Sequence, residues 1–241
     1  MTKATNLPLP PADFVGVTKY AIFPREKRAF HTVLDAHKIL AGSNNPISEI
    51  RYSRDGGDIV VGLDHPIADG RLREEMRLVP SRDGDGLMMK AMTRQVFDAS
   101  GQVVRHEVVP DFRHDSLGLP LSTYPEVALP FLLAWMPLDG QRRSVYAWIN
   151  DRFIAKVYVE VEGKKSITIG GTSHDTIEVI MYPDLNDWIP MGAMVTRLVK
   201  PFVPKYRMWY ARQAPNRLVR FEGPYGPPGA PEVVLELSSR G

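Results

Sequence analysis

The sequence predicts a mainly β protein of the α+β class, built as a large curled antiparallel sheet or open barrel that wraps two or three helices. Apolar and polar residues alternate in many short runs, and clusters of Asp, Gly and Ser separate these runs, which is typical of antiparallel strands joined by tight turns. A few other segments carry apolar residues at helical spacing. About a dozen strands are too many for a flat sheet, because sheets of that size curl or split, and helices can fill the concave side.

The N-terminal part of the chain predicts two elements. Residues 1–25 are rich in proline and unpatterned, so we expect an arm that lies on the surface or on a partner subunit, followed by a single β-rich, barrel-like domain over 26–241. The segment "PREKRAFHTVLDAHKIL" (24–40) carries apolar residues at helical spacing behind a proline that can open a helix. A strand from His31 to Ile39 is the alternative.

The middle of the chain predicts a meander of strands over 47–112, with turns at "RDGGD", "PIADG", "SRDGDG" and "DASGQ". The segment "STYPEVALPFLLAWM" (122–136) then predicts an apolar helix kinked by its internal proline. Strands resume over 141–182. We expect the strands of both regions to be antiparallel neighbours, because their connections are short.

The C-terminal part predicts a second apolar helix, "NDWIPMGAMVTRLVKPF" (186–202), then a hairpin, "YRMWYARQAPNRLVRFEGP" (206–224), and a last strand, "EVVLEL" (232–237). Trp135 and Trp188 lie in the two most apolar helical stripes, so we expect both to be buried against the sheet.

The order of these elements, with the apolar helices "YPEVALPFLLAWM" and "DWIPMGAMVTRLVK", resembles half-barrel proteins of the LolA/LppX lipoprotein-carrier type. The resemblance implies a curled antiparallel sheet that wraps helices and can hold an acyl chain. It is carried by element order and not by a specific motif.

Composition excludes several classes of protein. The chain has 241 residues and a formal net charge of only +2, too weak a basic balance to predict nucleic-acid binding. It has no cysteine, which excludes disulfides, thiolate nucleophiles and Cys-ligated metal sites. The longest apolar run, Ala128–Leu138, is about half of what a membrane-spanning helix needs. The N-terminus lacks the apolar core of a signal peptide, so we expect a cytoplasmic protein.

Catalytic and cofactor motifs are missing. Neither of the two common glycine-rich nucleotide-binding patterns is present, and we expect no cofactor. Ser173, His174 and Asp175 are consecutive, so on a strand their side chains alternate between faces and cannot form a triad. The segment "RHEVVPDFRHD" (105–115) holds two His and three acidic residues in no known ligand pattern, and we predict no metal site. The charge run "RLREEMR" (71–77) predicts a solvated face.

Aromatic residues next to charge on one strand face provide the strongest functional indication. Alternation places Tyr146 with Trp148, and Arg207 with Trp209. Large rings beside arginine suit a cavity for a flat, partly polar ligand. A buried subunit interface, and therefore a homodimer, is the competing interpretation, because interfaces enrich the same residue types.

We therefore predict a site whose proton-transfer groups are Tyr158 with Lys156 or His106. Arg207 and Arg220 would bind a carboxylate or phenolate of the ligand. The walls of the cavity would come from the remaining aromatic residues, namely Trp148, Trp209, Tyr146 and Tyr182.

Three functions fit this sequence. The first is a cofactor-independent enzyme of the acid–base lyase, isomerase, decarboxylase or hydrolase type, acting on a small apolar or aromatic substrate in a barrel cavity. The alternative is a non-catalytic carrier or sensor of a hydrophobic ligand. A further alternative is a structural dimeric protein.

Overall fold

We describe the protein from a computed structural model, which places residues 4–25, 46–67, 70–81, 84, 86–109, 112, 119–150, 153–184, 205–224 and 232–238. The helix expected over 24–40, apart from its first two residues, and the one expected over 186–202, with Trp188, lie outside these described residues.

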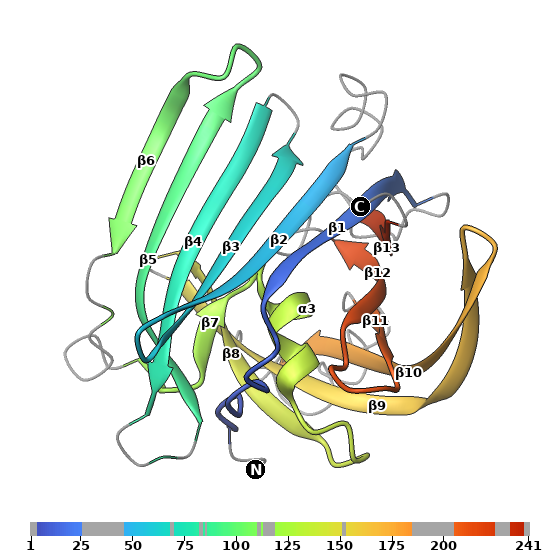
Figure 1. The fold of residues 1–241 in the computed structure, drawn as a ribbon. Helices are drawn as coiled ribbons and strands as arrows, with labels where there is room; N and C mark the ends of the chain where they lie inside the picture. The colour runs from blue at the N-terminus through green and yellow to red at the C-terminus, as the bar shows by residue number, and fades with distance from the viewer. Residues whose placement is uncertain are drawn as a thin grey trace, which may run out of the picture.

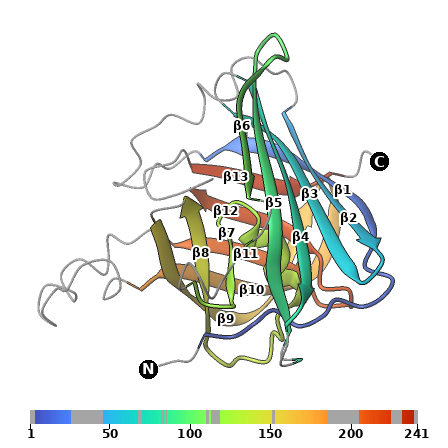
Figure 2. The same ribbon diagram turned by 90° about the vertical axis from the view of Figure 1, so that its left-hand side faces the viewer.

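One curled sheet dominates the fold. Its 13 strands follow the order β6-β5-β4-β3-β2-β1-β13-β12-β11-β10-β9-β8-β7, and every pair except β7–β8 is antiparallel. The mainly β, curled-sheet prediction is therefore confirmed. Figure 1 shows β2 to β6 as a tall wall and β8 to β10 bending beneath it, and Figure 2 shows the strands of the second half steeply inclined to that wall.

The wall is the meander expected over 47–112. Its strands are β2 (Ile47–Asp55), β3 (Asp58–Ile67), β4 (Gly70–Pro80), β5 (Leu87–Asp98) and β6 (Val103–Val109). The turns form where polar side chains and glycine permit them. Between β5 and β6, Asp98 accepts hydrogen bonds from the backbone N–H groups of Ser100 and Gln102, each at 2.9 Å, while Gly101 takes a φ of +82°.

The second half supplies the curled part of the sheet. Its strands are β7 (Thr123–Pro125), β8 (Arg143–Asn150), β9 (Phe153–Ile169), β10 (Thr172–Pro183), β11 (Tyr206–Ala211), β12 (Leu218–Pro224) and β13 (Glu232–Leu237). The register shifts within β8–β9, β9–β10 and β11–β12. Such irregularities bend strands and increase their twist, which favours a curled sheet over a flat one.

The two halves join through β1 (Gly16–Pro24), which pairs with β2 on one side and β13 on the other. The segment Gly16–Pro24, which belongs to the arm expected over 1–25, is thus a strand in the middle of the sheet. The first part runs beside the wall, where Leu7 forms an isolated bridge with Leu87.

The concave side is filled by a short helical segment, α3 (Leu129–Leu132) followed by the 3₁₀ turn η1 (Leu133–Trp135), which lies inside the curl (Figure 1). This segment is shorter than the helix expected over 122–136, because Thr123–Pro125 pairs with β8 as a parallel strand instead. Trp135 is buried, as predicted, and packs edge-on against Phe14 at 5.6 Å between centroids. The hydroxyl of Tyr210 donates to the Pro130 carbonyl at 2.6 Å, fixing the helix to β11.

Candidate functional site

A row of charged side chains crosses the concave face of the wall. In the strand register Glu74 stands opposite Leu63 of β3 on one side and Arg94 of β5 on the other, and Arg94 stands opposite Glu107 of β6. Residues directly opposite each other share a face, and Leu63 is buried in the core. Glu74 and Arg94 therefore point inward, although they are ionisable.

The overlap of the two sheet ends buries this row. The guanidinium carbon of Arg94 lies 5.3 Å from the ring centroid of Trp148 on β8, and the Trp148 carbonyl accepts the backbone N–H of Glu126 at 3.1 Å. Glu126, the first residue after β7, therefore lies next to Trp148. We call Glu74, Arg94 and Glu126 the inner charge cluster.

Ion pairing compensates this burial only in part. Arg94 Nε donates to Glu74 Oε1 at 2.5 Å, with side-chain exposures of 12% and 0%, and Glu107 Oε2 lies 3.9 Å from Arg94 Nη1. Glu74 Oε2 and Glu126 Oε2 are both buried and have no hydrogen-bond partner among the described residues. A buried acceptor without a donor is costly, so these two oxygens are the most unusual polar atoms of the concave face.

Burial also shifts the protonation of the cluster. Desolvation raises the pKa of Glu126 to about 8, against the lowering effect of the Arg94 charge. Desolvation likewise raises the pKa of Glu74, again opposed by Arg94. On β3, burial lowers the pKa of His65 to about 3, so that imidazole is neutral. At neutral pH Glu126 therefore holds a proton for most of the time and can donate as well as accept a hydrogen bond.

The described residues contain no group of three or more His, Asp or Glu side chains placed to hold a metal ion. Within the same residues, no helix is long and apolar enough to cross a membrane.

Several of the predicted site residues gather on β8, β9 and β10, on the strand face that also carries Trp148. Tyr158 pairs with Tyr182, and Lys156 with Tyr146, and the rings of Tyr158 and Tyr182 are 5.7 Å apart. The Tyr158 hydroxyl donates to Asp184 at 2.5 Å, while Lys156 Nζ lies 5.6 Å from the Tyr158 ring and Lys156 is only 6% exposed.

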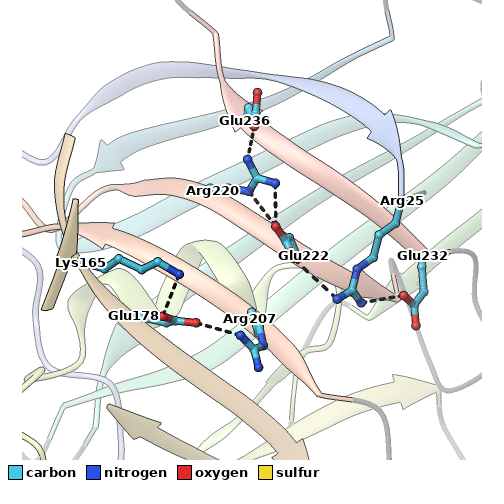
Figure 3. A network of polar contacts seen from close by, with 8 residues as sticks. All are labelled: Arg25, Lys165, Glu178, Arg207, Arg220, Glu222, Glu232 and Glu236. Carbon is cyan, nitrogen blue, oxygen red and sulfur yellow. Dashed lines mark hydrogen bonds and ion pairs between the residues drawn. The ribbon is translucent and has the colours of Figure 1, made fainter. Parts of the chain in front are cut away.

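A second group, on β11 and β12, forms an ion-pair network rather than isolated cations. Figure 3 shows Glu178 between Lys165 and Arg207, at 3.7 and 3.2 Å, and Arg220 Nη2 bound to Glu222 at 2.6 Å. The Arg220–Glu222 pair belongs to a separate set of ion pairs that also contains Arg25, Glu232 and Glu236.

Trp209 lies beneath this network and is 4% exposed, with Lys165 and Arg220 5.7 and 5.8 Å from its ring. The long cations cover the indole while their charged ends pair with carboxylates. This arrangement explains why aromatic and basic residues alternate on one strand face. The predicted part of Arg207, Trp209 and Arg220 in ligand binding stays a prediction.

The other two predicted residues lie elsewhere. His106 is on the exposed edge strand β6, and nine strands separate β6 from β9 in the sheet order. Trp148 contacts the inner charge cluster instead. The structure therefore brings Lys156 and Tyr158 together but places His106 on another part of the sheet.

The charge run over 71–77 is solvated only in alternate positions. Arg73 and Glu75 are exposed, but Glu74 is buried, which corrects the expected solvated face. Sequence reasoning missed Glu74, Arg94 and Glu126 as a site. The available signal was the alternation in β4, which places Glu74 in phase with the buried Met76 and Leu78.

The chain is similar to a solved lipoprotein structure. No family model and no curated protein matches the chain. A solved structure, the Mycobacterium tuberculosis lipoprotein LppX, matches with 11% identity and a TM-score of 0.26, covering 93% of this chain and 86% of that one. The weak resemblance expected from element order is thus confirmed.

The prediction of a cofactor-independent acid–base enzyme is wrong and is corrected here. This solved structure is named as a lipoprotein and not as an enzyme, and His106 lies on β6, away from the other two predicted proton-transfer groups on β9.

Proposed function

We propose that the protein is a non-catalytic carrier of an apolar ligand, held on the concave side of the sheet with its polar end at the inner charge cluster. The observation that carries the proposal is the Oε2 atom of Glu74, which is buried and lacks a partner among the described residues. A protein rarely keeps such an acceptor unless something supplies a donor.

The packed apolar core of the concave side could surround an apolar body of the ligand once its side chains repack. It is rich in methionine, and these side chains are between 0 and 4% exposed: Met76, Met89, Met92, Met181 and Met208. Methionine is unbranched and polarisable, so it can repack around ligands of different shape. A face of this kind favours chains and rings of variable outline over one rigid substrate.

The charges favour a donor at the polar end of the ligand. Arg94 already pairs with Glu74 and has Glu107 as a further neighbour, so its charge is compensated. The open positions are the second carboxyl oxygens of Glu74 and Glu126. A hydroxyl, amide or ammonium group can donate to Glu74, whereas a carboxylate or phosphate would be repelled by its charge.

Titration calorimetry with decylamine, 1-decanol and decanoate, which share one chain and differ only in the head group, tests this proposal. We expect the amine and the alcohol to bind and decanoate to bind more weakly. Glu74→Gln removes the acceptor charge and should weaken decylamine binding roughly tenfold or more.

Glu75→Gln is the matched control, because Glu75 is the next residue of β4 and is exposed on the opposite face. It should leave binding unchanged. Failure of all three probes to bind would overturn the proposed carrier function. Preferential binding of decanoate, or equal losses from both variants, would overturn the assignment of the polar end to Glu74.

A further inference from the structure

Strand β6 ends the sheet with an open edge. Among the described residues it pairs only with β5, and Figures 1 and 2 show no strand beyond it. Three of its seven residues are exposed valines, Val103, Val104 and Val108, with exposures of 49, 62 and 53%. It contains neither proline nor lysine, the residues that commonly protect such an edge.

The sequence of this edge, "VVRHEVV", is symmetric in its chemistry about His106. When the strand lies antiparallel to a second copy centred on this residue, each valine faces a valine. Each Arg105 then faces a Glu107 of the second copy, which gives two opposite-charge pairs.

We propose that two copies of the chain dimerise by antiparallel pairing of their β6 edges, around a two-fold axis at His106. Charge complementarity of the strand with itself selects a second copy as the occupant, since a strand of unrelated sequence would satisfy this symmetry only by chance. The two-fold operation keeps the concave faces of both sheets on the same side, because Arg105 and Glu107 are two residues apart and share a face.

The local geometry favours a short pairing. Arg105 stands opposite Val96 and Val103 opposite Phe97, so Val104 is the extra residue of a bulge, which twists that end of the strand. The regular part of the symmetric pairing runs from Arg105 to Glu107 and includes the charged pairs, because Val108 and Val109 face the bulged end of the second copy. A contact of this length predicts a dimer in equilibrium with monomer rather than an obligate one.

Charge reversal tests the pairing through sedimentation velocity over a range of concentrations. Arg105→Glu places like charges opposite each other in its own homodimer, and so does Glu107→Arg. Each variant should raise the dimer dissociation constant by roughly tenfold or more. An equimolar mixture of the two variants places opposite charges across the interface again, so it should restore dimerisation as a heterodimer.

Cysteine cross-linking tests the register without altering the charges. The chain has no cysteine, so His106→Cys introduces a single thiol that would lie opposite its own copy, within the Cα separation that a disulfide needs. Mild oxidation should give a covalent dimer of this variant. Val17→Cys, which is also exposed and lies on β1, is the control and should remain monomeric on a denaturing gel.

A monomeric wild-type protein at every concentration would overturn the proposal, as would a dimer that both charge variants leave intact. If thermal melts show that Glu107→Arg is unfolded, the cysteine variants test the pairing instead. Equal cross-linking of His106→Cys and Val17→Cys would then also count against pairing through β6.

Discussion

Arg94 of β5 lies over the indole of Trp148 of β8. These strands are second and twelfth in the order of the sheet, so the contact joins parts of the sheet that backbone pairing keeps far apart. It also buries the guanidinium beside Glu74, and the stability of the overlap should therefore depend on how well these charges are compensated.

Arg94→Ala should lower the free energy of unfolding by about 3–5 kcal/mol, because it leaves Glu74 buried without its cation. Urea denaturation measures this change. Replacing the pair together, as Arg94→Met with Glu74→Leu, should recover most of the loss, since the uncompensated charge is gone. Arg51→Ala, which breaks a largely exposed pair with Glu49, should cost about 1 kcal/mol or less. Equal losses from Arg94→Ala and Arg51→Ala would contradict burial of the cluster.

Glu126 should make stability depend on pH. Its pKa in the folded state is raised to about 8 from the ordinary value of 4.5, so the folded protein binds the proton more tightly than the unfolded chain. Its contribution to stability is therefore fully present below pH 4.5 and is lost as the pH rises towards 8.

Glu126→Gln should abolish this loss and make the protein more stable than wild type at pH 8, by about 4 kcal/mol. Urea melts between pH 5 and 9 give the two curves. Glu75→Gln, an exposed neighbour of the cluster, should follow wild type throughout. A wild-type curve that rises over this range would show that the Glu126 pKa is not raised.

On the opposite face, Trp209 should matter more for stability than the cation next to it. Trp209→Ala removes a buried indole and should cost about 3–5 kcal/mol. Arg207→Ala breaks a pair whose cation is 49% exposed and should cost about 1 kcal/mol or less. Thermal and urea melts of both variants measure this difference. Similar losses from the two would mean that the ion pairs, and not the packed ring, hold this face together.

The N-terminal segment should detach when a methyl group is added at Gly86. A Cβ there would lie 2.4 Å from the Leu7 carbonyl oxygen, which now accepts the Leu87 N–H at 2.6 Å. Gly86→Ala should therefore expose the segment before β1 to limited proteolysis. Gly84→Ala is the control, because Gly84 also has a positive φ but no atom within 4 Å of its Cβ position. Equal cleavage of both variants would assign the effect to backbone strain alone.

Local sequence patterns predicted the strands well, because alternation and Asp/Gly turns depend on neighbouring residues. They indicated the shared faces of Tyr158 with Lys156 and of Arg207 with Trp209, which the register confirms. They did not predict the pairing of β1 with β13, since periodicity does not identify the partner of a strand. For the same reason the helix expected over 122–136 was too long: the parallel pairing of Thr123–Pro125 with β8 replaces its first turn.

Sequence patterns did not predict the inner charge cluster, for a related reason. Glu74 and Arg94 lie on neighbouring strands, but Glu126 and Trp148 meet them only through the curl of the whole sheet. A charged residue in phase with apolar neighbours indicates burial, yet it does not identify the group that compensates it.

The position of β13 has a consequence for how the chain acquires its structure. In the strand order, β13 is the one link between β1 and β12, and Tyr20 of β1 faces Leu237 of β13, although the two are far apart in the sequence. The wall and the curled half can each fold from local hairpins, which form quickly because their strands are close in the sequence. Until β13 emerges from the ribosome, the edges of β1 and β12 that will pair with it have unpaired backbone N–H and C=O groups. During synthesis, the two halves are therefore prone to aggregation until β13 is available to join them.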